Sequence, residues 1–189
     1  MNLEKELAVA KEAAVKAGYA IMDVYENAED MQISYKDGDM PLTAADKASN
    51  RIIVDALKEA FPEYAILSEE EKDDLSRLDN DYCFVVDPLD GTKEFIKRNG
   101  EFTVNIALVQ NSVPVFGIIY VPVKKELYFG IEGVGAYKCS GIVSLEDDGV
   151  ALEQLIGKSE QIPLKEVHDH LIVVASRSHL SPETESYIA

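Results

Sequence analysis

Apolar residues recur at steps of three and four along the start of the chain, which is the spacing of one face of an α-helix. They are Leu3, Leu7, Ala10, Ala14, Ala17, Ile21 and Val24. This pattern predicts one long amphipathic helix that ends near Asn27. A second amphipathic run predicts a helix over Ala45 to Phe61, which stops there because Pro62 cannot continue it.

Shorter apolar runs separated by turn residues predict strands. We expect a strand over Met31 to Lys36 followed by a turn at 37–39, and two short buried strands at Ala65 to Ser68 and Cys83 to Val86. A meander of antiparallel strands is then predicted over Thr103–Val109, Pro114–Val121, Glu126–Ile131 and Gly135–Lys138. Later in the chain we expect a buried strand at Leu171 to Val174 and a helix capped by Ser181 with Pro182 at its first position.

The order of these elements predicts a layered fold of the α/β (α+β) class. We place a first, complete domain at residues 1–144. An acidic and less regular stretch at 145–165 is interpreted as a linker or insertion, and residues 166–189 as the beginning of a second α/β domain.

Charge and cysteine content narrow the function classes. A net charge of -17 over 189 residues argues against binding of nucleic-acid polymers, which need a basic surface. Lys93, Lys97 and Arg98 could attract an anionic substrate, although they could equally form a solvated helix face. Cys83 and Cys139 form no disulfide framework, and no stretch is apolar enough for a signal or a membrane span. We therefore expect a cytoplasmic protein, with peripheral attachment to the inner membrane as an alternative and the oligomeric state left open.

Acidic residues follow both short buried strands. Asp87 and Asp90 come after one strand, on a turn built from Asp-Pro and Asp-Gly, and Glu69 and Glu70 come after the other. Neighbouring strands would bring these carboxylates into one crevice, where their repulsion favours a divalent cation such as Mg²⁺. The alternatives are a plain turn after the second strand and a solvated acidic loop after the first.

Three further residues could complete such a centre. Because Gly91 has no side chain, backbone N–H groups could approach an anion there, beside a short helix beginning near Lys93. The Thr92 hydroxyl could hold a water. Asp46 follows Thr43 by three residues, so it fits both a helix capping box and a catalytic role, and the sequence leaves both open.

These motifs resemble the inositol monophosphatase superfamily. The resemblance rests on Thr43–Asp46, Leu67–Glu70, Val86–Thr92 and the segment from Lys93 to Leu108. That last segment is similar to the bacterial 3'(2'),5'-bisphosphate nucleotidases. The resemblance extends from near the first helix to the end of the chain.

The resemblance implies a layered α-β-α, sugar-phosphatase-like architecture that binds two or three Mg²⁺ ions. It also implies that Li⁺ would compete for one of the metal sites and so inhibit. Glu69, Asp87 and the carbonyl of Leu89 would hold one ion, and Asp87 and Asp90 would share another with an aspartate from a later motif. Asp46, Thr92 and Glu69 would be catalytic, the first two by orienting a water. The pocket would be lined by Leu89, Asp90, Gly91 and Thr92, with Arg177 and His179 facing the nucleotide, although an ordinary polar loop is equally compatible with Arg177 and His179.

The activity implied by the resemblance is hydrolysis of 3'-phosphoadenosine 5'-phosphate to AMP and phosphate by a metal-activated water, with a role in sulfur assimilation. An inositol- or sugar-phosphate phosphatase with the same centre is one alternative. A fragment that binds metal or a partner without hydrolysis is another, because the chain contains no Trp and lacks the Trp-Asp-x-Ala-Ala motif of the family. We therefore expect a truncated chain.

Overall fold

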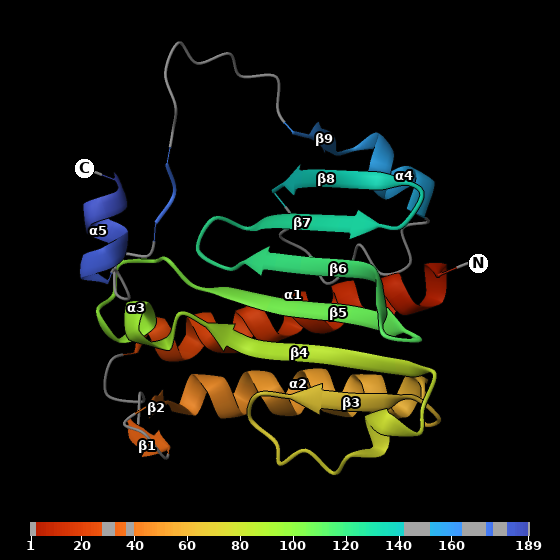
Figure 1. Cartoon of the computed structure of the whole chain (residues 1–189), viewed down its shortest axis with the longest axis horizontal. Coiled ribbons are helices and arrows are strands. Elements are labelled where there is room, and N and C mark those ends of the chain that lie inside the picture. Colours follow the sequence, from red (N-terminus) through yellow and green to blue (C-terminus); the bar gives the residue numbers. More distant parts are fainter. Residues whose placement is uncertain are drawn as a thin grey trace.

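A seven-stranded sheet forms the centre of the molecule (Figure 1). The computed structural model describes residues 3–27, 33–36, 40–141, 152–163, 173–175 and 181–188. The strands lie in chain order and are β3 (Ala65–Ser68), β4 (Tyr82–Asp90), β5 (Thr103–Gln110), β6 (Val113–Val121), β7 (Glu126–Ile131), β8 (Gly135–Ser140) and β9 (Glu160–Ile162). β3 runs parallel to β4, and each later pair is antiparallel. β1 (Ser34–Lys36) and β2 (Met40–Leu42) form a separate antiparallel pair.

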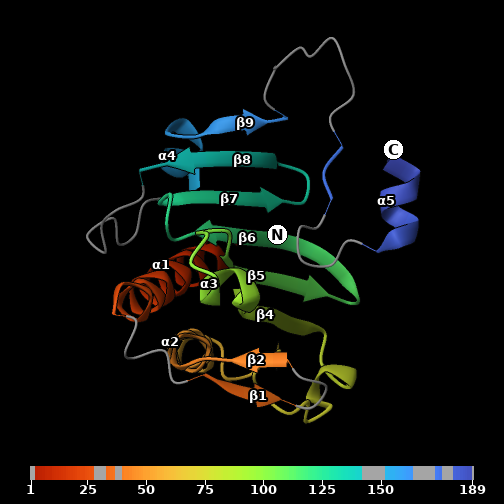
Figure 2. The same ribbon diagram turned by 90° about the vertical axis from the view of Figure 1, so that its left-hand side faces the viewer.

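Two long helices, α1 (Glu4–Glu26) and α2 (Ala44–Ala60), cover one face of this sheet (Figure 2). α1 buries a row of alanines together with Leu7 and Ile21, and such small side chains let a helix lie close to its neighbours. The strands contribute alternate side chains to the same core, among them Phe84, Ile106 and Phe129, which are almost fully buried. The core therefore lies between the helix pair and the sheet.

Three shorter helices and a 3₁₀ turn complete the described structure. α3 (Thr92–Ile96) follows β4, and the 3₁₀ turn (Ser76–Leu78) lies between β3 and β4. α4 (Leu152–Gly157) precedes β9, and α5 (Pro182–Ile188) is exposed along its length. No helix in the described ranges is both long enough and apolar enough to cross a membrane.

The face of the sheet opposite α1 and α2 carries a shallow cavity of about 870 Å³. Its floor includes a row of small residues on adjacent strands, in which Ala107 pairs with Gly117, Gly117 with Gly130, and Gly130 with Ala136. Most of the cavity is apolar. Its polar end is formed by Glu69, Asp87 and Asn105, so the acidic residues singled out in the sequence lie at the end of an apolar trough.

The α/β (α+β) class is confirmed, and so are most of the predicted elements. Both long helices lie within one residue of their predicted bounds at each end, and the strands predicted at 65–68 and 126–131 match β3 and β7. Ser181 caps α5 as predicted, since its hydroxyl accepts a hydrogen bond from the Thr184 N–H at 3.2 Å. The turn predicted at 37–39 lies outside the described residues.

Among the described elements, β2, α4, β9 and the 3₁₀ turn at Ser76–Leu78 were not predicted. β9 pairs with β8 and extends the sheet into the stretch interpreted as a linker, while the domain division itself remains a prediction. The buried strand predicted at Leu171 to Val174 is wrong for its described part, because Val173 and Val174 are 61% and 92% exposed and have no strand structure. An apolar run becomes a buried strand only where a neighbour pairs with it.

Candidate metal centre

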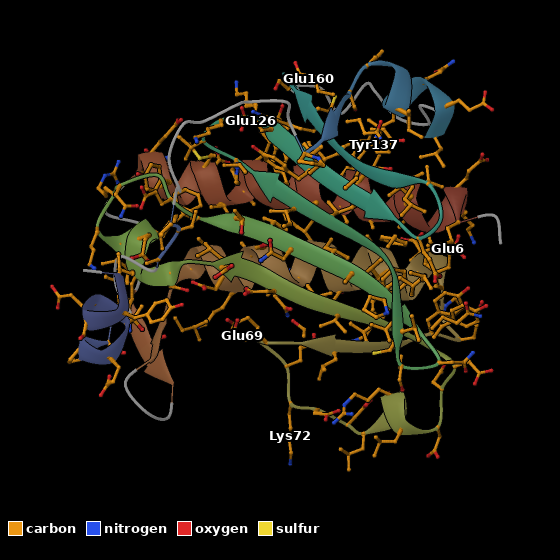
Figure 3. The ribbon with its side chains drawn as sticks, turned by 45° about the horizontal axis from the view of Figure 1, so that its top comes forward. Glu6, Glu69, Lys72, Glu126, Tyr137 and Glu160 are labelled. Atoms are coloured by element: carbon orange, nitrogen blue, oxygen red, sulfur yellow. The ribbon has the colours of Figure 1, made fainter. Side chains whose placement is uncertain are left out.

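The parallel pairing of β3 with β4 brings Glu69 and Asp87 to the same end of the sheet. Ser68 lies opposite Val86, and the Glu69 N–H donates to the Val86 carbonyl at 3.1 Å, which continues the pairing by one step. Figure 3 shows Glu69 where the chain leaves β3, at the start of the loop that carries Lys72 away from the sheet. Glu71 and Asp73 in this loop bond to Lys58 and Arg77, which confirms the solvated-loop interpretation for that stretch.

A β-bulge in β4 places Asp87 and Asp90 on one face of the sheet. Asp87 pairs with Asn105 and Asp90 with Thr103, so three steps along β4 correspond to two along β5. Residues three apart in a regular strand face opposite ways, and the extra residue of the bulge removes that difference. The simple turn considered for the sequence after Val86 is therefore wrong. β4 continues through Asp90 because the bulge absorbs Pro88, which has no N–H for a ladder.

Asp87 lies in surroundings that disfavour its charge. Burial, the charges of Glu69 and Asp90, and a hydrogen bond with the Glu69 side chain together raise the pKa of Asp87 to about 7. Within the described residues, no three His, Cys, Asp or Glu side chains are already gathered as a metal-binding group. Glu69 and Asp90 instead act on Asp87 as neighbouring negative charges, which a divalent cation could neutralise. Carboxylate oxygens together with the Leu89 carbonyl are the hard donors that Mg²⁺ prefers, so the donor set fits this ion.

Asp46 both caps α2 and bonds to Thr92. One oxygen of its carboxylate accepts from the Thr43 N–H at 2.7 Å and from the Thr43 hydroxyl at 2.5 Å, while the Asp46 N–H bonds back to that hydroxyl. This confirms the capping box. The other oxygen accepts from the Thr92 hydroxyl at 3.1 Å, so capping leaves Asp46 able to orient Thr92.

The segment from Asp87 to Thr92, which contains the bulge, is fixed by hydrogen bonds and close packing. The hydroxyl of Ser49 on α2 donates to the Pro88 carbonyl at 2.6 Å, and the Leu89 N–H donates to the Asp87 carboxylate at 3.2 Å. Gly91 has φ +94°, and a Cβ there would lie 2.8 Å from the Glu101 carbonyl oxygen. Glycine is thus required by backbone shape and close packing, a reason that the sequence analysis did not foresee.

The remaining predicted residues have different outcomes. Arg177 and His179 lie outside the described residues, so their roles stay predictions. In the basic group beside the centre, Lys97 pairs with Glu94 at 4.0 Å and Arg98 lies over the Tyr25 ring.

No role was predicted for two polar residues of this region. They are Ser49, which lies on the buried side of α2, and Asn105, which lies in β5 within the segment from Lys93 to Leu108. The signals that could have found Asn105 are its place in that segment and its position two residues after Thr103, which puts both side chains on the same face of the strand.

Comparison with known proteins agrees with this architecture. The 3'(2'),5'-bisphosphate nucleotidase CysQ of Salmonella typhimurium is 40% identical over 176 residues, which cover 93% of this chain and 65% of that protein. The Escherichia coli K12 protein of the same name is 39% identical over the same shares. The chain thus spans about 65% of the length of these curated relatives.

Solved structures give the same result. The crystal structure of CysQ from Bacteroides thetaiotaomicron superimposes with a TM-score of 0.85 at 57% identity, covering 99% of this chain and 69% of that one. An inositol monophosphatase from Anabaena is 35% identical with a TM-score of 0.60, over 73% of this chain and 48% of the other. The inositol monophosphatase family model matches residues 2–186. Because this match spans nearly the whole sequence, the chain belongs to the inositol monophosphatase family.

Proposed function

We propose that this chain acts as a Mg²⁺-dependent phosphomonoesterase that hydrolyses 3'-phosphoadenosine 5'-phosphate to AMP and phosphate. The observation that carries the proposal is the convergence of Glu69, Asp87 and Asp90 at one end of the sheet, where Thr92 is hydrogen bonded to Asp46. The choice of a nucleotide substrate is supported by the likeness to proteins named CysQ bisphosphate nucleotidases.

Glu69, Asp87 and the Leu89 carbonyl would hold one Mg²⁺, and Asp90 would join Asp87 around another. When bound, Mg²⁺ neutralises phosphate charge and lowers the pKa of a nearby water. The chain itself supplies fixed oxygen ligands. The bulge brings both aspartates to one face, and the Ser49 bond to Pro88 fixes the backbone that leads to the Leu89 carbonyl.

Thr92 and Asp46 would orient the attacking water. Because the Thr92 hydroxyl donates its proton to Asp46, its oxygen can accept a hydrogen bond from water and direct a lone pair of that water toward the phosphorus. Asp46 cannot readily turn away, since Thr43 holds its second oxygen and the side chain is 1% exposed.

The further parts of the proposal concern the nucleotide and its setting. Arg177 and His179 would contact the nucleotide end of the substrate. The free thiols of Cys83 and Cys139 are compatible with a reducing cytoplasm, where removal of this nucleotide would serve sulfur assimilation.

A second candidate is a phosphatase of inositol or sugar phosphates. It is supported by the 35% identity to a structure named an inositol monophosphatase, in which the fold is shared. The two substrate classes differ in the part of the molecule away from the phosphate, so the acidic centre serves both equally. A direct comparison of turnover separates them.

The test is phosphate release by the 189-residue chain with Mg²⁺, measured with 3'-phosphoadenosine 5'-phosphate and with inositol 1-phosphate. Asp90→Asn should lower release by at least about 100-fold, because it removes a metal ligand. Asp55→Asn is the matched control, since it removes one carboxylate from the exposed side of α2. Faster release from the inositol phosphate would favour the second candidate. Release insensitive to Asp90→Asn, or no release, would reject hydrolysis by this chain and leave metal binding without turnover.

A further inference from the structure

Asn105 connects the acidic centre to the neighbouring strand. It lies in β5 opposite Asp87, and its side-chain amide donates to the Asp90 carboxylate at 3.1 Å. The Thr103 hydroxyl donates to the Asn105 side-chain oxygen at 3.0 Å. Thr103, Asn105 and Asp90 therefore form a hydrogen-bonded chain along one face of the sheet, at the polar end of the apolar trough.

The orientation of the Asn105 amide is fixed by its two partners. If the amide were turned by 180°, its oxygen would face the Asp90 carboxylate, and two acceptors would oppose each other. In the observed orientation, the NH₂ group meets the carboxylate and the oxygen meets a hydroxyl that can donate. Both contacts are satisfied in this arrangement alone, so Asn105 has one preferred orientation.

We propose that Asn105 is a positioning residue, which holds the Asp90 carboxylate ready for a divalent cation while Thr103 holds Asn105. This role rests on the metal centre of the proposed function. The bond engages one Asp90 oxygen, so the other can serve a cation. Because the side chain is already ordered, less rotamer entropy is lost when the cation binds.

The neutral charge of Asn105 matters as much as its hydrogen bond. Glu69, Asp87 and Asp90 already bring three acidic side chains to one end of the sheet. An aspartate at position 105 would add a further charge to this cluster and could not donate to Asp90. Asparagine instead supplies a hydrogen-bond donor that carries no charge. A positively charged side chain in its place would compete with the cation for the same carboxylates.

The test measures Mn²⁺ binding to the 189-residue chain by the electron paramagnetic resonance signal of free Mn²⁺, without substrate. Asn105→Ala should weaken Mn²⁺ affinity about tenfold, in the range typical of residues that orient metal ligands. Thr103→Val should weaken it less, and Thr103→Ser, which keeps the hydroxyl, should stay within about twofold of the unaltered chain. The thermal midpoint of each variant in EDTA shows whether it folds.

Weaker Mn²⁺ binding by Asn105→Ala and Thr103→Val at an unchanged metal-free midpoint supports the positioning role. Equal affinity of Asn105→Ala and the unaltered chain overturns it while leaving the metal centre in place. A drop in midpoint that matches the loss of affinity in every variant overturns it in favour of a structural role. If the unaltered chain binds no Mn²⁺, the metal centre itself fails, and the positioning role is rejected with it.

Discussion

The surroundings of Asp87 disfavour its charged form, so the stability of the metal-free chain should depend on pH. In the folded chain its pKa is about 7, whereas an unfolded aspartate releases its proton near 4. Well below pH 4 the Asp87 carboxyl is protonated in both the folded and the unfolded state, so it does not lower the free energy of unfolding. As pH rises from 4 through 7, the unfolded state gives up the proton more readily, so stability falls and then stays low above 7.

We therefore expect Asp87→Asn to stabilise the metal-free chain above pH 7. The gain in the free energy of unfolding should be about 2 kcal/mol at pH 8 and near zero at pH 4, because a pKa unit corresponds to about 1.4 kcal/mol and solvent screens part of the repulsion. Urea unfolding in EDTA at both pH values measures it. Asp55→Asn, on an exposed carboxylate, should change little at either pH. An equal gain at pH 4 and pH 8 would contradict the electrostatic explanation.

Substitution of Gly91 tests whether the backbone after β4 requires glycine. Alanine there would have to adopt φ near +94° and would place its Cβ 2.8 Å from a backbone oxygen. Gly91→Ala should lower the free energy of unfolding by about 2 to 3 kcal/mol. Gly117→Ala is the matched control, because Gly117 lies in β6 with nothing within 4 Å of its Cβ position. Thermal unfolding compares them, and a similar loss in both variants would mean that the loop geometry is not the cause.

At the scale of elements, the sequence predicted those whose pattern is local. The spacing of Leu7, Ala14 and Ile21 specifies the buried face of α1 without reference to any neighbour. The missed elements, β2, α4, β9 and the 3₁₀ turn, span only three to six residues each. Such short elements depend on tertiary partners, as β9 depends on β8. A local pattern cannot reveal such partners.

In the candidate centre, too, residues with a local sequence signal were predicted and features that depend on tertiary partners were not. Asp87, Asp90 and Gly91 were predicted because the Asp-Pro and Asp-Gly pairs interrupt an apolar run. The bulge was not predicted, because it is defined by the register of β4 against β5. Ser49 was missed because its partner Pro88 lies on an element distant in sequence, and Asn105 was missed because its bond to Asp90 depends on how β5 pairs with β4. The ligand residues can thus be found locally, and the groups that orient them require the fold.

The bond from α2 to the bulged end of β4 gives a prediction at this scale. The Ser49 hydroxyl donates to the Pro88 carbonyl at 2.6 Å, and both residues are buried. Ser49→Ala leaves that carbonyl without this donor, which should lower the free energy of unfolding by about 1 to 3 kcal/mol. Lys47→Ala, on the exposed side of the same helix, should change it by less than about 0.5 kcal/mol. Urea unfolding measures both, and equal effects would show that the contact does not stabilise the loop.

Over the whole molecule, 35 acidic residues against 18 basic ones create a negative field. Such a field attracts divalent cations toward the acidic end of the sheet and opposes an anionic substrate until those cations are bound. Its range shrinks with added salt, since the Debye length falls from about 30 Å at 0.01 M to about 10 Å at 0.1 M. Salt can therefore weaken cation binding in two ways, by screening the field of the whole molecule and by supplying a cation that competes at the centre. The choice of salt separates the two.

Salts of different cations should weaken Mn²⁺ binding to different extents. Tetramethylammonium chloride is too bulky to enter a small oxygen site, so it reports screening alone. Raising it from about 10 to 100 mM should lower Mn²⁺ affinity several-fold. The proposed centre adds the expectation that LiCl lowers it further at the same ionic strength, because Li⁺ is a small, hard cation that suits carboxylate oxygens. If the two salts act alike on the unaltered chain, Li⁺ does not compete for these ligands. A greater effect of LiCl that disappears in Asp90→Asn but persists in Asp55→Asn would assign the competition to the Asp90 site.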